Sequence, residues 1–94
     1  MECRKIKYSD HAFMQMFYRN ISFEVVEDVL RNGITIEEYP DDNPYPSRLL
    51  FGFVKNRPIH MVVAFEENKK TCIIVTAYQP DEKWWTSNFK TRKK

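Results

Sequence analysis

The hydrophobic period of this chain changes once, at Ile34, and this change restricts its fold more than any other feature. Before Ile34, apolar residues recur at the three- and four-residue spacing of a helix. From Ile34 to Tyr39 they alternate with polar residues, which is the pattern of a strand with one buried face. Three more segments rich in β-branched and aromatic residues follow, at 48–54, 59–65 and 71–78. The order of helices first and strands afterwards predicts an α+β domain.

Residues 9–32 are predicted to form two short helices joined by a tight turn. Ser9 and Ser22 each stand where a side-chain oxygen can cap the first free N–H groups of a helix. Asn20 readily takes the left-handed conformation that ends a helix, and Gly33 stops the second helix.

The links between the last three strand segments are short and polar, which favours antiparallel hairpins over long crossover connections. Residues 40–47 contain three prolines and are predicted to be an exposed loop. Pro80 suits the first turn of a helix, and the acids that follow it suit the helix dipole. We therefore expect a four-stranded antiparallel sheet, two N-terminal helices on one of its faces, and a short C-terminal helix over 80–89. The expected core includes these residues: Phe13, Phe17, Val26, Leu30, Leu49, Phe51, Val63 and Ile74.

The chain of 94 residues has room for one core, so a single domain over 1–94 is expected. We find no signal-like or membrane-spanning apolar run, and we expect a cytoplasmic protein that does not enter the membrane. Cys3 and Cys72 lack metal-ligand spacing and are expected to be reduced thiols, with no bound metal. Gly33 and Gly52 are the only glycines, so no phosphate-binding loop and no nucleotide cofactor are expected.

Charge is distributed unevenly along the chain. Residues 1–47 carry five basic and nine acidic side chains, whereas residues 48–94 carry ten basic and four acidic ones. The tail over 83–94 has five basic residues, three aromatic ones and no acid, a composition that contacts phosphates and stacks on bases. Two alternatives stay open: the tail binds RNA, or Trp84 or Trp85 covers the sheet while the terminal lysines serve solubility. The predicted RNA-binding residues are Arg57, Lys90, Arg92, Lys93 and Lys94.

The two histidines are candidate proton-transfer groups because an imidazole titrates near neutral pH. His11 lies in the first helical turn, where capping the helix is an equal alternative. His60 lies on a central strand, where a hydrogen-bonded core position is an equal alternative. With Arg48 and Tyr78 they form a set able to cleave RNA without a metal, since one group removes a proton, another returns it, and arginine offsets negative charge. The acids at 37–38 and 41–42 are interpreted as a solvated edge.

Ordered motifs over about residues 8–85 resemble a family of small bacterial and archaeal proteins catalogued only as a domain of unknown function. The motifs are Ser9-Asp10-His11-Ala12, Arg19-Asn20-Ile21-Ser22, Val26 to Gly33, Glu38 to Asp42, Pro44 to Leu50, Pro58 to Val63, Ile74 to Asp81, and Trp84.

This family is in turn remotely similar to toxins of the BrnT and RelE type. That resemblance implies two helices on a twisted antiparallel sheet, cleavage of messenger RNA, in some cases on the ribosome, and a small antitoxin protein as partner. His11, Arg48, His60 and Tyr78 match the family's own motif, and Arg19 matches it too. The late Arg-x-x-x-Arg pair of the BrnT type is missing from the sequence. The alternative is a non-catalytic protein-interaction or RNA-binding module of the same fold.

Overall fold

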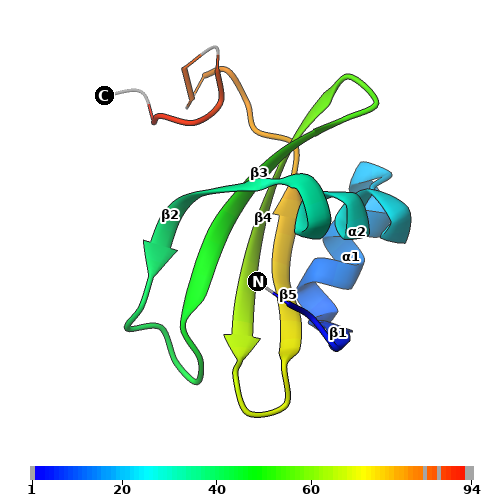
Figure 1. Ribbon diagram of the computed structural model, residues 1–94. Helices are drawn as coiled ribbons and strands as arrows, with labels where there is room; N and C mark the ends of the chain where they lie inside the picture. The colour runs from blue at the N-terminus through cyan, green and yellow to red at the C-terminus, as the bar shows by residue number, and fades with distance from the viewer. Residues whose placement is uncertain (1, 84, 87, 93–94) are drawn as a thin grey trace.

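A five-stranded sheet with two helices on one face forms the body of the molecule (Figure 1). The computed structural model describes residues 2–83, 85–86 and 88–92. The helices lie to the right of the sheet in Figure 1, and the segment after the last strand lies at the upper left. The elements in chain order are β1 (Lys5–Tyr8), α1 (Asp10–Arg19), α2 (Phe23–Asn32), β2 (Ile34–Tyr39), β3 (Ser47–Val54), β4 (Arg57–Glu66) and β5 (Thr71–Tyr78).

The sheet is mixed, with the strand order β1-β5-β4-β3-β2. Strands β2 to β5 pair antiparallel with their sequence neighbours, but β1 pairs parallel with β5, with Ile6 opposite Cys72. The prediction of a four-stranded, purely antiparallel sheet was therefore wrong. The four residues of β1 are too few for a clear alternation, and their partners lie 66 positions later in the chain.

Both helices begin and end where local chemistry favours it. The Ser9 side chain accepts a hydrogen bond from the Ala12 N–H at 3.0 Å, and Asn20 ends α1 with left-handed angles of φ 55° and ψ 48°. The Ser22 side chain accepts from the Val25 N–H at 3.2 Å. A Cβ atom at Gly33 would lie 2.5 Å from the Val29 carbonyl oxygen, so only glycine fits this turn from α2 into β2.

The main core lies between the helices and the sheet. Val26, Val63 and Ile74 are buried there, and Leu49 is buried on the opposite sheet face. Leu30 and Phe51 are only half-buried.

The expectation that Phe13 and Phe17 belong to the core was wrong. Both are exposed, and α1 buries Ala12 and Met16 instead. The apolar residues of α1 form two stripes on the helix. The stripe with the smaller side chains, Ala12 and Met16, packs against the sheet because β5 approaches α1 closely.

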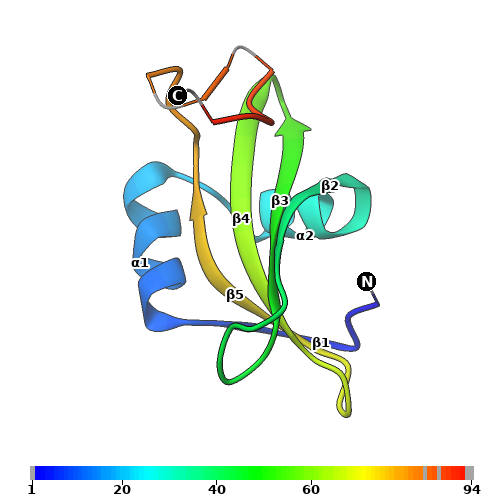
Figure 2. The same cartoon turned by 90° about the vertical axis from the view of Figure 1, so that its left-hand side faces the viewer.

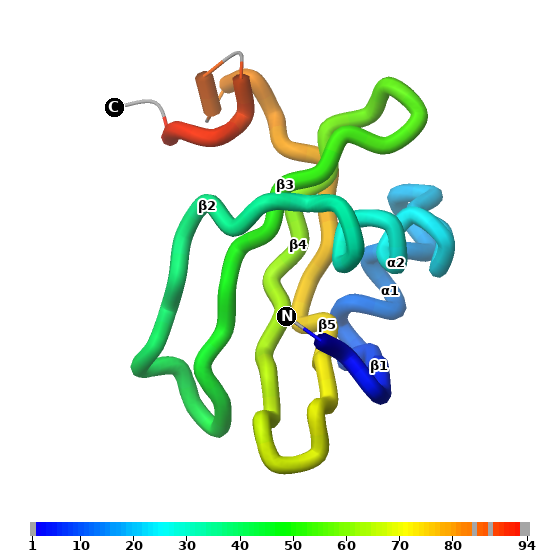
Figure 3. Tube along the Cα trace, viewed as in Figure 1, coloured from blue at the N-terminus to red at the C-terminus, as the bar shows by residue number. Residues whose placement is uncertain are grey.

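The chain after β5 does not form the predicted helix over 80–89; its described residues form turns (Figure 3). Trp85 and Arg92 are joined by an antiparallel β-bridge, and Trp85 is buried. Packing of this ring on the sheet outweighs the helix-start signals at Pro80 and the acids after it. Trp84 lies outside the described residues.

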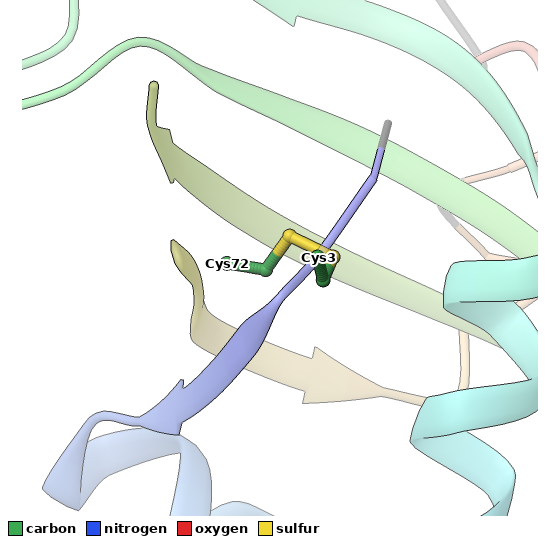
Figure 4. Close-up of a disulfide and its surroundings, with 2 residues drawn as sticks. All are labelled: Cys3 and Cys72. Carbon is green, nitrogen blue, oxygen red and sulfur yellow. A yellow bond between two sulfur atoms is a disulfide. The ribbon is translucent and has the colours of Figure 1, made fainter. Parts of the chain in front are cut away.

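A disulfide joins Cys3 to Cys72 (Figure 4), so the prediction of two reduced thiols was wrong. Their Cα atoms are 5.5 Å apart because β1 lies alongside β5, a pairing that the sequence spacing did not show. No helix in the described part of the chain is long and apolar enough to cross a membrane.

Candidate functional site

His60 occupies the centre of the sheet face opposite the helices. It lies on β4, and its side chain is fully buried. Few polar side chains in the described part of the chain are buried in this way. The ring centroid of Trp85 is 4.3 Å away, that of Tyr78 is 5.4 Å away and that of Phe51 is 5.7 Å away. The described residues after β5, which are 79–83, 85–86 and 88–92 and are hereafter called the C-terminal segment, lie at one end of the sheet in Figure 2. They contribute Trp85 to this cover.

The hydrogen bonds of His60 define which ring nitrogen carries the proton. Nε2 lies 2.7 Å from the carbonyl oxygen of Phe89, and a carbonyl oxygen only accepts, so Nε2 must donate. In the neutral ring Nδ1 is then an acceptor, and it lies 3.2 Å from the Tyr78 hydroxyl. The Tyr78 O–H therefore donates to His60 and leaves its oxygen lone pairs free to accept.

Burial shifts the ionisation of both members of this pair. Removal from water lowers the pKa of His60, although its hydrogen bond to the Phe89 backbone opposes the shift. The same loss of water raises the pKa of Tyr78. At neutral pH the pair therefore consists of an uncharged imidazole and an uncharged phenol.

The lowered His60 pKa predicts a loss of stability in acid. The unfolded chain takes up a proton near the ordinary value of 6.5, whereas the folded chain does so only at lower pH. The free energy of unfolding should therefore fall as the pH drops below about 6.5, by at most about 1.4 kcal/mol per pH unit, and level off below the folded pKa. Urea titrations from pH 7.5 downwards measure this. The fall in unfolding free energy should persist in His11→Gln, since His11 is exposed, and should disappear in His60→Gln. If the unfolding free energy of both variants had the same pH dependence, His60 would not be its cause.

A groove of about 430 Å³ opens beside Tyr78, where α1, β5 and the C-terminal segment meet. Tyr78 itself is half-buried, so its edge is accessible from the groove. Arg19, from the last turn of α1, brings a positive charge to the same groove. The residues lining it are Gln15, Arg19, Thr76, Tyr78, Gln79, Asp81 and Trp85.

Arg57 fixes the end of the helix that carries Arg19. Its guanidinium donates to the carbonyl oxygens of Arg19, at 3.0 Å, and Asn20, at 2.9 Å, and its Nε donates to Gln79 at 3.2 Å. These carbonyls have no partner within the helix, so a cation at this end stabilises it. Arg57, predicted as an RNA contact, thus holds two walls of the groove together.

Arg92 holds the C-terminal segment against the sheet. Its guanidinium lies 5.1 Å from the centre of the Trp85 ring, and its Nε lies 3.7 Å from a Glu37 carboxylate oxygen. Glu37 also accepts a hydrogen bond from the Tyr39 hydroxyl. Burial and this carboxylate raise the pKa of Tyr39 to about 12.

The structure brings together two of the four predicted catalytic residues, His60 and Tyr78. Arg48 is in register with Val63, whose side chain faces the helices, so it lies on the other face of the sheet from His60. There it forms an exposed pair with Glu38 at 3.6 Å. His11 is exposed on α1 and does not line the groove.

Of the predicted RNA-binding tail, Lys90 and Arg92 are exposed. Lys93 and Lys94 lie outside the described residues. Within the described ranges, no group of three or more His, Cys, Asp or Glu side chains could hold a metal ion.

The groove itself was not predicted from the sequence. Gln15 and Arg19 are four residues apart, so they share one side of α1, and Thr76 and Tyr78 share one side of β5. Both spacings can be read from the sequence. That these two sides meet depends on how α1 packs against β5, which no local pattern reveals.

A family model matches residues 8–79, most of the chain. No curated protein matches the sequence, and no solved structure matches the fold. The family is described as a domain of unknown function (DUF4258), and its span includes β2 to β5, both helices, and Arg19, His60 and Tyr78 of the site. The chain belongs to this DUF4258 family.

Proposed function

We propose that this domain is a toxin-like endoribonuclease that cleaves RNA without a metal, in the groove between α1 and β5. The observation that carries the proposal is that Tyr78, which lines a groove that also holds an arginine, is hydrogen-bonded to the buried His60 behind it. An acid–base pair beside a cation is what internal attack by a ribose hydroxyl requires.

The proposed reaction has two steps, and the proton that the pair takes up in the first step is returned in the second. The 2′-oxygen bonds to the adjacent phosphorus while the 2′-hydroxyl proton passes to the Tyr78 oxygen, and Tyr78 passes its own proton to Nδ1 of His60. The bond from phosphorus to the 5′-oxygen then breaks, and the proton returns through Tyr78 to that oxygen. The products are a 2′,3′-cyclic phosphate and a free 5′-hydroxyl.

Each neighbour has a defined task in this scheme. The carbonyl of Phe89 accepts from Nε2 and so keeps Nδ1 available as the proton acceptor. Arg19 offsets the negative charge that gathers on the phosphate oxygens, and Arg57 fixes the helix end from which it projects.

The test is cleavage of a labelled single-stranded RNA by purified variants. Tyr78→Phe removes only the hydroxyl, and Arg19→Gln removes only the charge. Each should lower the cleavage rate by about a hundredfold to ten-thousandfold, the usual contribution of such groups. Arg48→Gln is the matched control, because its charge lies on the other sheet face, and it should change the rate by less than about threefold.

Two results would overturn the proposal: a wild-type protein that leaves RNA intact, or cleavage that survives both Tyr78→Phe and Arg19→Gln. Products ending in a 3′-hydroxyl would exclude attack by the 2′-hydroxyl.

One observation favours a non-catalytic RNA-binding or protein-interaction module instead. His60 is fully buried and both its ring nitrogens are hydrogen-bonded, as in a structural histidine. In that case the wild-type protein should bind RNA without cutting it, and Tyr78→Phe should leave the affinity unchanged.

The proposal includes a partner and a compartment. Our proposal of messenger RNA as substrate and a small antitoxin as inhibitor rests on the resemblance to BrnT and RelE toxins inferred from the sequence, together with the basic residues of the tail. Such a target lies in the cytoplasm, where thiols are kept reduced. We therefore propose that the protein acts on RNA in the cytoplasm in its reduced form, with the Cys3–Cys72 bond open.

A further inference from the structure

The outer side of α1 is apolar, although it faces solvent. Phe17 is 78% exposed and Tyr18 is 75% exposed, while Phe13 and Met14 are each about half exposed. Single exposed apolar residues are common on proteins, but these four are neighbours on one ten-residue helix.

The apolar surface continues onto the start of α2. The ring of Phe23 lies 6.2 Å from that of Phe13 and 5.0 Å from that of Tyr8, measured between centroids. Phe23 is itself half exposed. We call the set Phe13, Met14, Phe17, Tyr18 and Phe23 the α1 patch.

The α1 patch is comparable in area to the largest apolar patch on a typical monomer. A large aromatic side chain has about 150–250 Å² of surface, so four aromatic residues and one methionine, each exposed by about half or more, offer on the order of 500 Å² of apolar area. The largest patch on a typical monomer is about 300–600 Å² and often functional. A standard interface needs about 800 Å² per partner, and the α1 patch accounts for more than half of that area.

Charges at the two ends of the α1 patch have opposite signs. Asp10 lies one turn before Phe13 and Met14, and Glu24 follows Phe23 directly. Burial, and to a lesser extent the nearby Glu27 carboxylate, raises the pKa of Tyr8. At the other end of α1 stands the exposed Arg19.

We propose that the α1 patch is the interface of a symmetric dimer of this chain, with the two α1 helices antiparallel. A two-fold axis through the middle of the patch stacks aromatic side chains of one copy on those of the other. The same axis brings the acidic end of each α1 beside the Arg19 end of its partner. The inference does not require the proposed ribonuclease activity, although both use Arg19.

The same charges disfavour two other occupants. An RNA strand or an anionic lipid surface would meet the carboxylates of Asp10, Glu24 and Glu27 at the rim, and like charges repel. A second copy of the chain instead brings its Arg19 beside the acidic end of α1 in the first copy.

Sedimentation velocity over about 1–300 μM measures the association directly. The wild-type protein should shift from monomer to dimer with concentration, and Phe17→Ser should raise the dimer dissociation constant by about thirtyfold or more, as for a central interface residue. Phe53→Ser is the matched control: Phe53 is 60% exposed, but it lies on β3, outside the patch, and this change should leave association unaltered.

A charge exchange tests the two-fold geometry. Asp10→Lys and Arg19→Glu should each weaken the dimer by about threefold to tenfold, and the double variant should restore it, because it again places opposite charges together. A wild-type monomer at every concentration would overturn the inference. So would association without a defined stoichiometry, an unrestored double variant, or a monomer that binds phosphatidylcholine vesicles through Phe17.

Discussion

Replacing His60 by alanine is expected to lower the free energy of unfolding by about 3–5 kcal/mol, a large part of the total for a domain of this size. The change removes a ring that is fully buried against Trp85, Tyr78 and Phe51. It also leaves the Phe89 carbonyl and the Tyr78 hydroxyl without their partner, which adds to the cost of the cavity. Urea unfolding followed by tryptophan fluorescence measures the difference, because Trp85 packs directly on the ring.

Two variants separate the contributions to this effect. Tyr78→Phe removes one hydrogen bond and no ring, and should cost only about 1 kcal/mol. His11→Ala changes an exposed histidine and should stay within about 0.5 kcal/mol of the wild type. If His60→Ala were as mild as His11→Ala, the C-terminal segment would not cover the ring in solution.

Opening the Cys3–Cys72 disulfide is expected to cost about 4 kcal/mol of stability. The two residues are 69 positions apart, and in the chain-entropy model a cross-link over so long a loop strongly restricts the unfolded state. Comparing the urea midpoint with and without a reductant measures the effect. Cys3 lies next to β1. Opening the disulfide should therefore reduce protection against hydrogen exchange most strongly for the amide protons of β1.

The control for this experiment is Cys3→Ala. The reductant should have no effect on its stability, because the variant holds no bond to open. Two reactive thiols in the denatured, unreduced wild-type protein would show that the bond does not form.

Local chemistry made the helices predictable. The Ser9 and Ser22 caps and the left-handed Asn20 act within four residues of their own position, so their effect can be read from the sequence. The same local reading was wrong about Phe13 and Phe17, since the α1 sequence contains two apolar stripes. Which stripe is buried depends on the distance between α1 and β5, which is a property of the whole domain.

The errors in the sheet and in the tail have one physical origin, which is pairing over long sequence separations. β1 is held by β5, and Cys3 by Cys72, although each pair is more than sixty residues apart. The residues after Pro80 favour a helix locally, but the contacts of Trp85 with His60 and Arg92 outweigh this preference. For the site, the sequence identified His60 and Tyr78 by residue type, but the groove and the place of Arg19 in it follow only from tertiary packing.

The parallel pairing of the first strand with the last has a consequence for synthesis on the ribosome. A chain emerging from its N-terminus presents β1 and α1 long before β5 exists, so neither can complete its contacts until residues 71–78 have left the exit tunnel. Closing so long a loop is slow, and meanwhile the apolar residues of α1 are available to other nascent chains or to chaperones. The cover over His60 forms later still, because Trp85 and Phe89 follow β5 in the chain. A growing chain therefore carries an incomplete His60 site until Trp85 and Phe89 have also left the exit tunnel.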